Sequence, residues 1–180
     1  MYTRNYVKKL VIAGLLLAIG VIIPYIFHMT GIAGTIFLPM HIPVLLGGFL
    51  LPPPLAFILG ALTPLLNSLV SGMPALFPMA IIMMIELGFY GLITSLLYRK
   101  LRLPSILTLI ISMIVGRLMA GLMVFLLAIF FSGDLAPAFL DPIAFMITGL
   151  ATGLPGIIIQ LILIPTLIYS IMKYTTIDLD

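Results

Sequence analysis

Long apolar stretches alternate along this chain with short segments that hold most of its polar residues. One stretch, from Ile106 to Phe131, contains a single charged residue, Arg117. A helix needs about 20 mainly apolar residues to cross the hydrocarbon core of a bilayer, so this stretch predicts a transmembrane helix over residues 105–131. The other stretches predict five further helices, over about residues 9–27, 40–51, 55–70, 75–98 and 143–172. The pattern therefore predicts an all-α membrane protein with six transmembrane helices.

Prolines interrupt two neighbouring helices of this set. The segment 40–51 is short for a full span, and the three consecutive prolines at 52–54 end it because they cannot continue a helix. The next helix, 55–70, contains Pro64. Irregular backbone at membrane depth is tolerated only against protein or a water-filled cavity. In transporters such interrupted segments often mark the binding site, and these two are expected to border one.

Basic residues mark one side of the predicted topology. Three precede the first helix, three follow the fourth and one follows the sixth: Arg4, Lys8, Lys9, Arg99, Lys100, Arg102 and Lys173. None lies in the other connections, 28–39, 67–74 and 132–142, the last of which contains Asp134 and Asp141. Because cytoplasmic loops are enriched in Lys and Arg, both termini are expected in the cytoplasm. The first apolar stretch is longer than a signal-peptide core and is expected to remain as the first helix.

The composition supports a membrane protein and excludes several other classes. The chain has 180 residues, of which 63% are hydrophobic and 7% charged, whereas a soluble domain carries about 25% charged residues. We expect one integral membrane domain over residues 1–180. The absence of cysteine excludes disulfides, zinc–thiolate sites and thiol catalysis. The net charge of +3 does not indicate nucleic-acid binding, because nearly all the basic residues flank apolar runs as topology signals.

Glu86 and Arg117 are the ionisable residues predicted to lie within the membrane. Glu86 lies about 11 residues and Arg117 about 14 residues from the outer end of its helix, so at about 1.5 Å per residue they share a similar depth. An arginine there costs about 2.5–3.5 kcal/mol, which a partner must offset. One interpretation is a Glu86–Arg117 pair that holds two helices together. The other interpretation is that the planar guanidinium of Arg117 binds an anionic substrate. Tyr90 lies one turn from Glu86 on the same face of the helix and is a further candidate for this site.

Further polar residues on the predicted helices are candidates for the same site. The last helix carries a polar stripe that consists of Thr148, Thr152 and Gln160. These residues are expected either to bind substrate or to form hydrogen bonds with other helices. His41 lies at the start of the second helix, and it is expected either to bind substrate or to anchor the start of that helix. No second metal ligand lies at a suitable spacing from it, so it is a poor candidate for a metal site. Asn67 and Ser71 lie near the outer end of the third helix. They are expected either to contact a ligand or to cap the helix and form the turn after it.

Signatures of catalysis and of ATP hydrolysis are missing from the sequence. It contains no HExxH motif, no GxSxG with a histidine partner and no aspartate cluster for a metal. It also contains no Walker motif. We therefore expect a protein that is not an enzyme, holds no metal or cofactor and cannot use ATP itself.

Three strings resemble one family of membrane proteins. FLPMHIPVLLGGFLLPPPLAFILGALTPLLNSLVSGMP (residues 37–74), MIELGFYG (84–91) and GRLMAG (116–121) resemble the substrate-binding S components of energy-coupling-factor (ECF) vitamin transporters. The resemblance implies a six-helix bundle in a bacterial cell membrane that binds a vitamin or precursor at its outer side. A transmembrane coupling subunit and two ATPases, all separate chains, would supply the energy from ATP.

The family also has a small-residue motif on its first helix, which docks on the coupling subunit. The matching pair in this chain is Gly14 and Ala18, with Ala13 alongside. Glycine replaces the first alanine of the motif and keeps that position small. The resemblance therefore implies a docking face at these three residues, whereas small residues at this spacing otherwise favour close packing within the bundle.

The resemblance implies a vitamin or a vitamin precursor as the substrate, and some residues bear on which one. Arg117 favours a substrate with a carboxylate, and the PMHIP string with the Gly116–Arg117 pair is most similar to pantothenate-type S components. The sequence does not exclude four other substrates: folate, niacin, pyridoxine and hydroxymethylpyrimidine. Two other classes also stay open: an intramembrane enzyme that uses Glu86, Arg117, Tyr90 and His41 as an acid–base set, and a facilitator that works without partners.

Overall fold

A computed structural model describes residues 2–31, 34–131, 133 and 135–174 of the chain. All regular elements in these ranges are helical, which confirms the all-α class. Five helices are long and apolar enough to cross a membrane, and a shorter apolar helical segment covers Gly34–Leu50. The six predicted helices are therefore present. Ser132 and Asp134, from the third predicted outer connection, lie outside the described residues.

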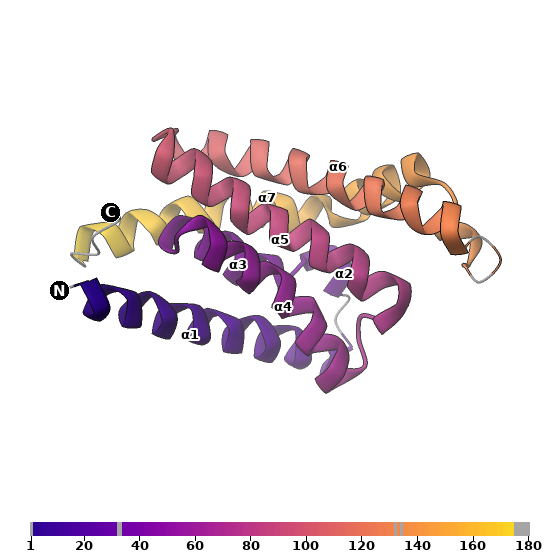
Figure 1. Ribbon diagram of the computed structural model, residues 1–180, viewed down its shortest axis with the longest axis horizontal. Helices are drawn as coiled ribbons and strands as arrows, with labels where there is room; N and C mark the ends of the chain where they lie inside the picture. Colours follow the sequence, from indigo (N-terminus) through magenta and orange to yellow (C-terminus); the bar gives the residue numbers. More distant parts are fainter. Residues whose placement is uncertain (1, 32–33, 132, 134, 175–180) are drawn as a thin grey trace.

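The helices follow the apolar stretches closely. Their bounds in chain order are α1 (Tyr2–Met29), α2 (Gly34–Phe37), α3 (His41–Leu50), α4 (Pro53–Ser71), η1 (Leu76–Ala80), α5 (Ile81–Ser95), η2 (Leu96–Lys100), α6 (Ser105–Phe131), η3 (Pro137–Phe139) and α7 (Pro142–Tyr174). The predicted stop after the second helix is found where α3 ends at Leu50 and Pro52 precedes α4. Figure 1 shows the long helices side by side, with the start of α1 and the end of α7 at the same end of the bundle.

The connections differ from the prediction in three places. The 28–39 connection contains the short helix α2, which packs against α7. The predicted connection 67–74 is shorter in the structure, because α4 continues to Ser71, close to the predicted helix end at residue 70. The predicted helix 75–98 has a kink near its start, where Phe77 has non-helical backbone angles within η1. Each difference lies near the end of a helix, where apolar composition alone does not fix the boundary.

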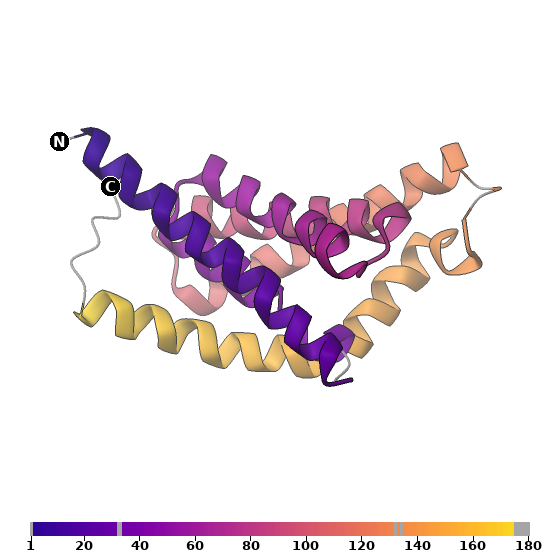
Figure 2. The ribbon, with the colours of Figure 1, turned by 90° about the horizontal axis from the view of Figure 1, so that it is seen from below.

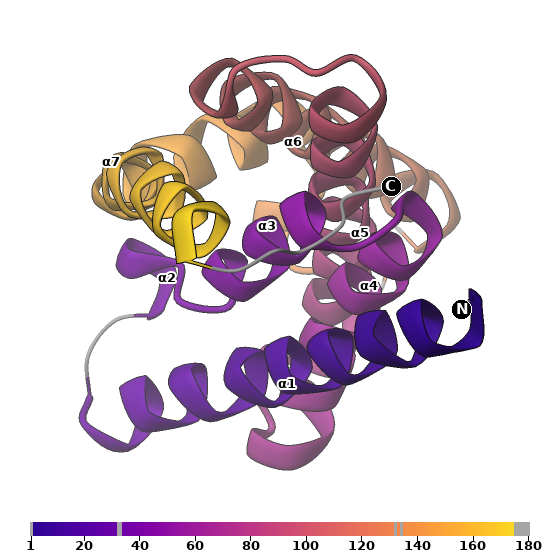
Figure 3. The same ribbon diagram turned by 90° about the vertical axis from the view of Figure 1, so that its left-hand side faces the viewer.

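The short helix α3 forms the centre of the bundle. It contacts α1, α4, α5 and α7, and Figure 3, viewed along the bundle, shows it enclosed by longer helices. Most of its side chains are buried, including Val44, Leu45 and Phe49. A helix too short to span the membrane is therefore stabilised by protein on all sides rather than by lipid, which fits the rule for interrupted segments.

The long helices surround this core and present apolar side chains outward. Val11 on α1, Ile114 on α6 and Ile162 on α7 are among many exposed large hydrophobic residues. Such a surface is suited to lipid and unsuited to water. Figure 2 shows that α7 changes direction along its length, and this helix contains Pro155 and Pro165, which are the usual cause of such bends.

Candidate functional site

A cavity of about 730 Å³ opens at the end of the bundle away from the start of α1 and the end of α7. We call this the distal end. The lining comes from the end of α1, from α2 and the start of α3, from residues 72–75, from α5 and α6, and from η3 and the first half of α7. Small-molecule sites typically have volumes of about 300–1,000 Å³. The cavity lies where the three predicted outer connections meet, so the distal end corresponds to the outer side predicted from the basic residues.

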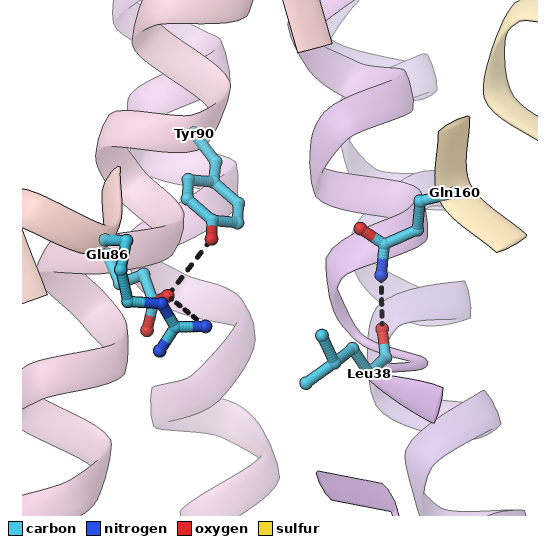
Figure 4. A network of polar contacts seen from close by, with 5 residues as sticks. Leu38, Glu86, Tyr90 and Gln160 are labelled. Carbon is cyan, nitrogen blue, oxygen red and sulfur yellow. Dashed lines mark hydrogen bonds and ion pairs between the residues drawn. The ribbon is translucent and has the colours of Figure 1, made fainter. Parts of the chain in front are cut away.

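Glu86 and Arg117 lie together at the bottom of this cavity. Arg117 Nη2 lies 3.2 Å from Glu86 Oε1, and the side chains are 16% and 3% exposed, respectively. The Tyr90 hydroxyl donates a hydrogen bond of 3.1 Å to the same Glu86 oxygen, as Figure 4 shows. Both charged residues line the cavity, whereas Tyr90 does not. The pair therefore joins α5 to α6 and leaves the Arg117 side chain partly exposed.

Two glycines allow this arrangement. A Cβ at Gly116 would overlap the Tyr90 ring, and a Cβ at Gly149 would lie 2.8 Å from Arg117 Nη1. The first glycine lets α5 and α6 approach closely below the ion pair. The second lets α7 approach the guanidinium from the opposite side. Any larger residue at either position would displace the group that it meets, so these glycines position Tyr90 and Arg117.

His41 is the other buried polar residue at the bottom of the cavity. Its side chain is 2% exposed, and its ring meets the Tyr90 ring edge to face, with centroids 5.5 Å apart. Its Nδ1 atom has no hydrogen-bond partner among the described residues. A buried polar atom without a partner costs about 1–3 kcal/mol. His41 also lines the cavity, but its Nδ1 atom is itself buried.

The remaining predicted site residues divide into two groups. Thr148 and Thr152 line the cavity. Asn67, Ser71 and Gln160 do not line it; instead they bond to the backbone. Asn67 Nδ2 donates to the carbonyls of Gly20 (2.8 Å) and Thr63 (2.9 Å). Ser71 Oγ donates to the Asn67 carbonyl at 2.7 Å.

Gln160 links α7 to the segment before α3. Its Nε2 donates to the Leu38 carbonyl at 3.4 Å, a contact drawn in Figure 4. Gln160 thus makes the inter-segment hydrogen bond that was its alternative role, Asn67 links α4 to α1, and Ser71 bonds within the last turn of α4.

Several residues of the cavity wall were not singled out as candidates from the sequence. They are His28, Thr35, Asp141, Phe139 and Phe145. Asp141 also caps α7, because its Oδ1 accepts from the backbone amides of residues 143 and 144 at 2.9 and 3.0 Å. An aspartate just before a helix is a recognisable capping signal, but no pattern in the sequence places it at the cavity. Among the described residues, no group of three or more His, Cys, Asp or Glu side chains gathers as metal ligands do.

The three small residues on α1 do not all face the same way. Gly14 and Ala18 are exposed, whereas Ala13 is partly buried and packs against the core. A Cβ at Gly14 would meet nothing within 4 Å. A glycine in a helix interior costs about 1 kcal/mol relative to alanine, and the packing of this chain does not require one at position 14. Gly14 and Ala18 thus form a small-residue surface that faces away from the bundle.

Comparison with known proteins gives one match. A family model described as "ECF transporter, substrate-specific component" matches residues 8–168. No curated protein and no solved structure matches the chain. The matched region includes all the long apolar helices, and only the first residues of α1 and the last residues of α7 lie outside it.

Proposed function

The chain belongs to the family of substrate-specific (S) components of ECF transporters, and from this premise we propose that its distal cavity binds a vitamin-sized substrate for uptake into the cell. S components of this family work with an ECF module, which consists of a transmembrane coupling subunit and two ATPases. The family has no enzymatic activity of its own. The substrate therefore enters the cell unchanged, and ATP is consumed by the partner chains.

One observation carries the choice of substrate. A buried ion pair opens into a cavity that is otherwise mostly apolar, and its cation, Arg117, remains 16% exposed there. A substrate carboxylate would form a charge-assisted contact with the guanidinium. We therefore propose a small carboxylic acid. Pantothenate is the candidate that the sequence resemblance favours; folate and niacin also carry a carboxylate, whereas pyridoxine and hydroxymethylpyrimidine do not.

The orientation in the membrane follows from the same proposal. The distal end faces outward, where it captures the substrate, and both termini lie in the cytoplasm of a bacterial cell. Gly14 and Ala18 dock on the coupling subunit, since small residues let two membrane helices approach closely. This arrangement is supported by the basic residues at the opposite end, which include Arg99, Lys100 and Lys173.

Reconstitution into liposomes tests the proposal. We expect radiolabelled pantothenate or another vitamin acid to accumulate only when the chain is combined with a coupling subunit, two ATPases and ATP. Vesicles whose ATPases carry a substituted Walker lysine are the matched control and should show no uptake. Uptake by the chain alone would contradict the proposal in favour of a facilitator, and chemical conversion of the substrate would favour an enzyme.

A further inference from the structure

The cavity changes from polar to apolar along α5 and the preceding η1, from its bottom toward its mouth. Glu86 lies deepest on α5, Met83 follows one turn nearer the distal end, and Met79 lies one turn farther, in η1. At about 1.5 Å per residue, Glu86 and Met79 are separated by roughly 10 Å along the helix. The carboxylate at the bottom is thus followed by two methionines, whose flexible thioethers pack against irregular apolar groups.

The opposite wall, on α7, changes in the same direction. Thr152 lies deepest and Gly149 faces the guanidinium of Arg117. Nearer the mouth the wall consists of Phe145 together with Phe139 of η3, whose ring centroids are 6.0 Å apart. On these two walls Glu86 and Thr152 lie toward the bottom of the cavity and Met79, Met83 and Phe145 lie nearer its mouth, where the lining also includes Asp141.

Polar groups in the outer part of the cavity are few. The Oδ1 atom of Asp141 already accepts two backbone amides at the start of α7. The other polar side chains in the lining toward this end are those of His28 and Thr35. A ligand with several hydroxyls along its body would leave some of them without partners against methionine, proline and phenylalanine, which is unfavourable. A body made of CH₂ groups or an apolar ring would instead gain from burial there.

From this gradient we propose that the preferred substrate is a monocarboxylic acid with an elongated apolar body about 10 Å long. Its carboxylate lies at Arg117, and its body lies along Met83, Met79 and Phe145. The inference rests on the proposed function, because it describes the same cavity. It ranks acids with apolar bodies above polyhydroxylated acids such as pantothenate.

Calorimetric titration of the full chain in lipid nanodiscs tests this preference. The probes are octanoate, octanamide and pantothenate, and empty nanodiscs correct for partitioning into lipid. We expect octanoate to bind at least tenfold more tightly than either of the other two. Tighter binding of pantothenate than of octanoate would overturn the inference and leave the proposed function intact. If neither acid binds more tightly than octanamide, the carboxylate site itself is wrong, and the inference fails with it.

A substitution in the apolar wall provides a second test. Met83→Gln keeps a similar size and places an amide beside the ligand body, so we expect octanoate affinity to fall at least fivefold and pantothenate affinity to hold or rise. Met83→Leu keeps the wall apolar and should retain most of the octanoate affinity. Met172→Gln, an exposed site near the opposite end of α7, is the matched control and should bind octanoate as the wild type does. Unchanged octanoate binding by Met83→Gln would overturn the inference.

Discussion

Replacing Arg117 by alanine is expected to weaken binding of the substrate acid by two or more orders of magnitude. Arg117 lines the cavity and keeps 16% of its side chain exposed while it contacts Glu86. The substitution removes a charge-assisted contact that is worth more in a dry cavity than in water. A hundredfold loss corresponds to about 2.7 kcal/mol. Calorimetry or equilibrium dialysis with the purified chain measures this difference.

Three controls separate contact with the substrate from support of the fold. Arg117→Lys should restore binding only in part, because an ammonium lacks the planar fork of the guanidinium. Amidation of the substrate carboxylate should weaken binding by the wild type strongly and by Arg117→Ala little, which is the test of direct coupling. The double variant Arg117→Gln with Glu86→Gln leaves no unpaired buried charge, and it should stay folded and still fail to bind the acid. If folded Arg117→Ala binds the acid as the wild type does, Arg117 is only the structural partner of Glu86.

Replacing Gly14 by leucine should abolish transport without changing substrate affinity. Gly14 is exposed, and a Cβ at this position would meet nothing within 4 Å among the described residues. A leucine therefore leaves the bundle intact but separates α1 from a coupling subunit whose helices must approach closely. Ala18→Leu, one turn along the same surface, should act in the same way. ATP-dependent uptake by the reconstituted complex and equilibrium binding by the isolated chain measure the two effects separately.

Ala151→Leu is the matched control for this experiment. Ala151 is also exposed, but it lies on α7, so a leucine there adds the same apolar volume to a different face. We expect normal uptake and normal binding. Equal loss of binding and transport in Gly14→Leu would instead mean that position 14 supports the bundle, and the docking proposal would fail.

The sequence was sufficient to predict the helices because the lipid environment imposes a simple rule. A membrane span requires about 20 apolar residues and internal satisfaction of its backbone, so α1, α4, α6 and α7 are visible as runs of apolar letters. The stop after α3 was also visible, because consecutive prolines cannot continue a helix. The Glu86–Arg117 pair was one of two interpretations that the sequence offered for Arg117, because the two residues are predicted at a similar depth, and the structure shows this contact.

The direction of individual side chains was much harder to predict. In a soluble protein, polar residues on one face of a helix indicate that the opposite, apolar face is buried. A membrane helix such as α1 is apolar on all sides, so its sequence does not show which face is buried. The sequence therefore did not decide whether Asn67 and Gln160 bind a ligand or bond within the protein, and in the structure both donate to the backbone of other segments. The outer part of the cavity depends on short segments such as α2 and η3, whose positions are set by packing against α7 and not by local sequence.

The central claim is that the distal cavity faces outward and holds the substrate, and accessibility of a single cysteine tests it most directly. The chain has no cysteine, so Ala144→Cys, in the cavity wall, would be its only thiol. We predict that a membrane-impermeant maleimide added to intact cells labels this thiol, and that the substrate acid slows the labelling. Gly133→Cys, at the same end but outside the lining, should be labelled at a rate independent of substrate. Labelling of Ala144→Cys only after permeabilisation, or at an unchanged rate with saturating substrate, would contradict the account.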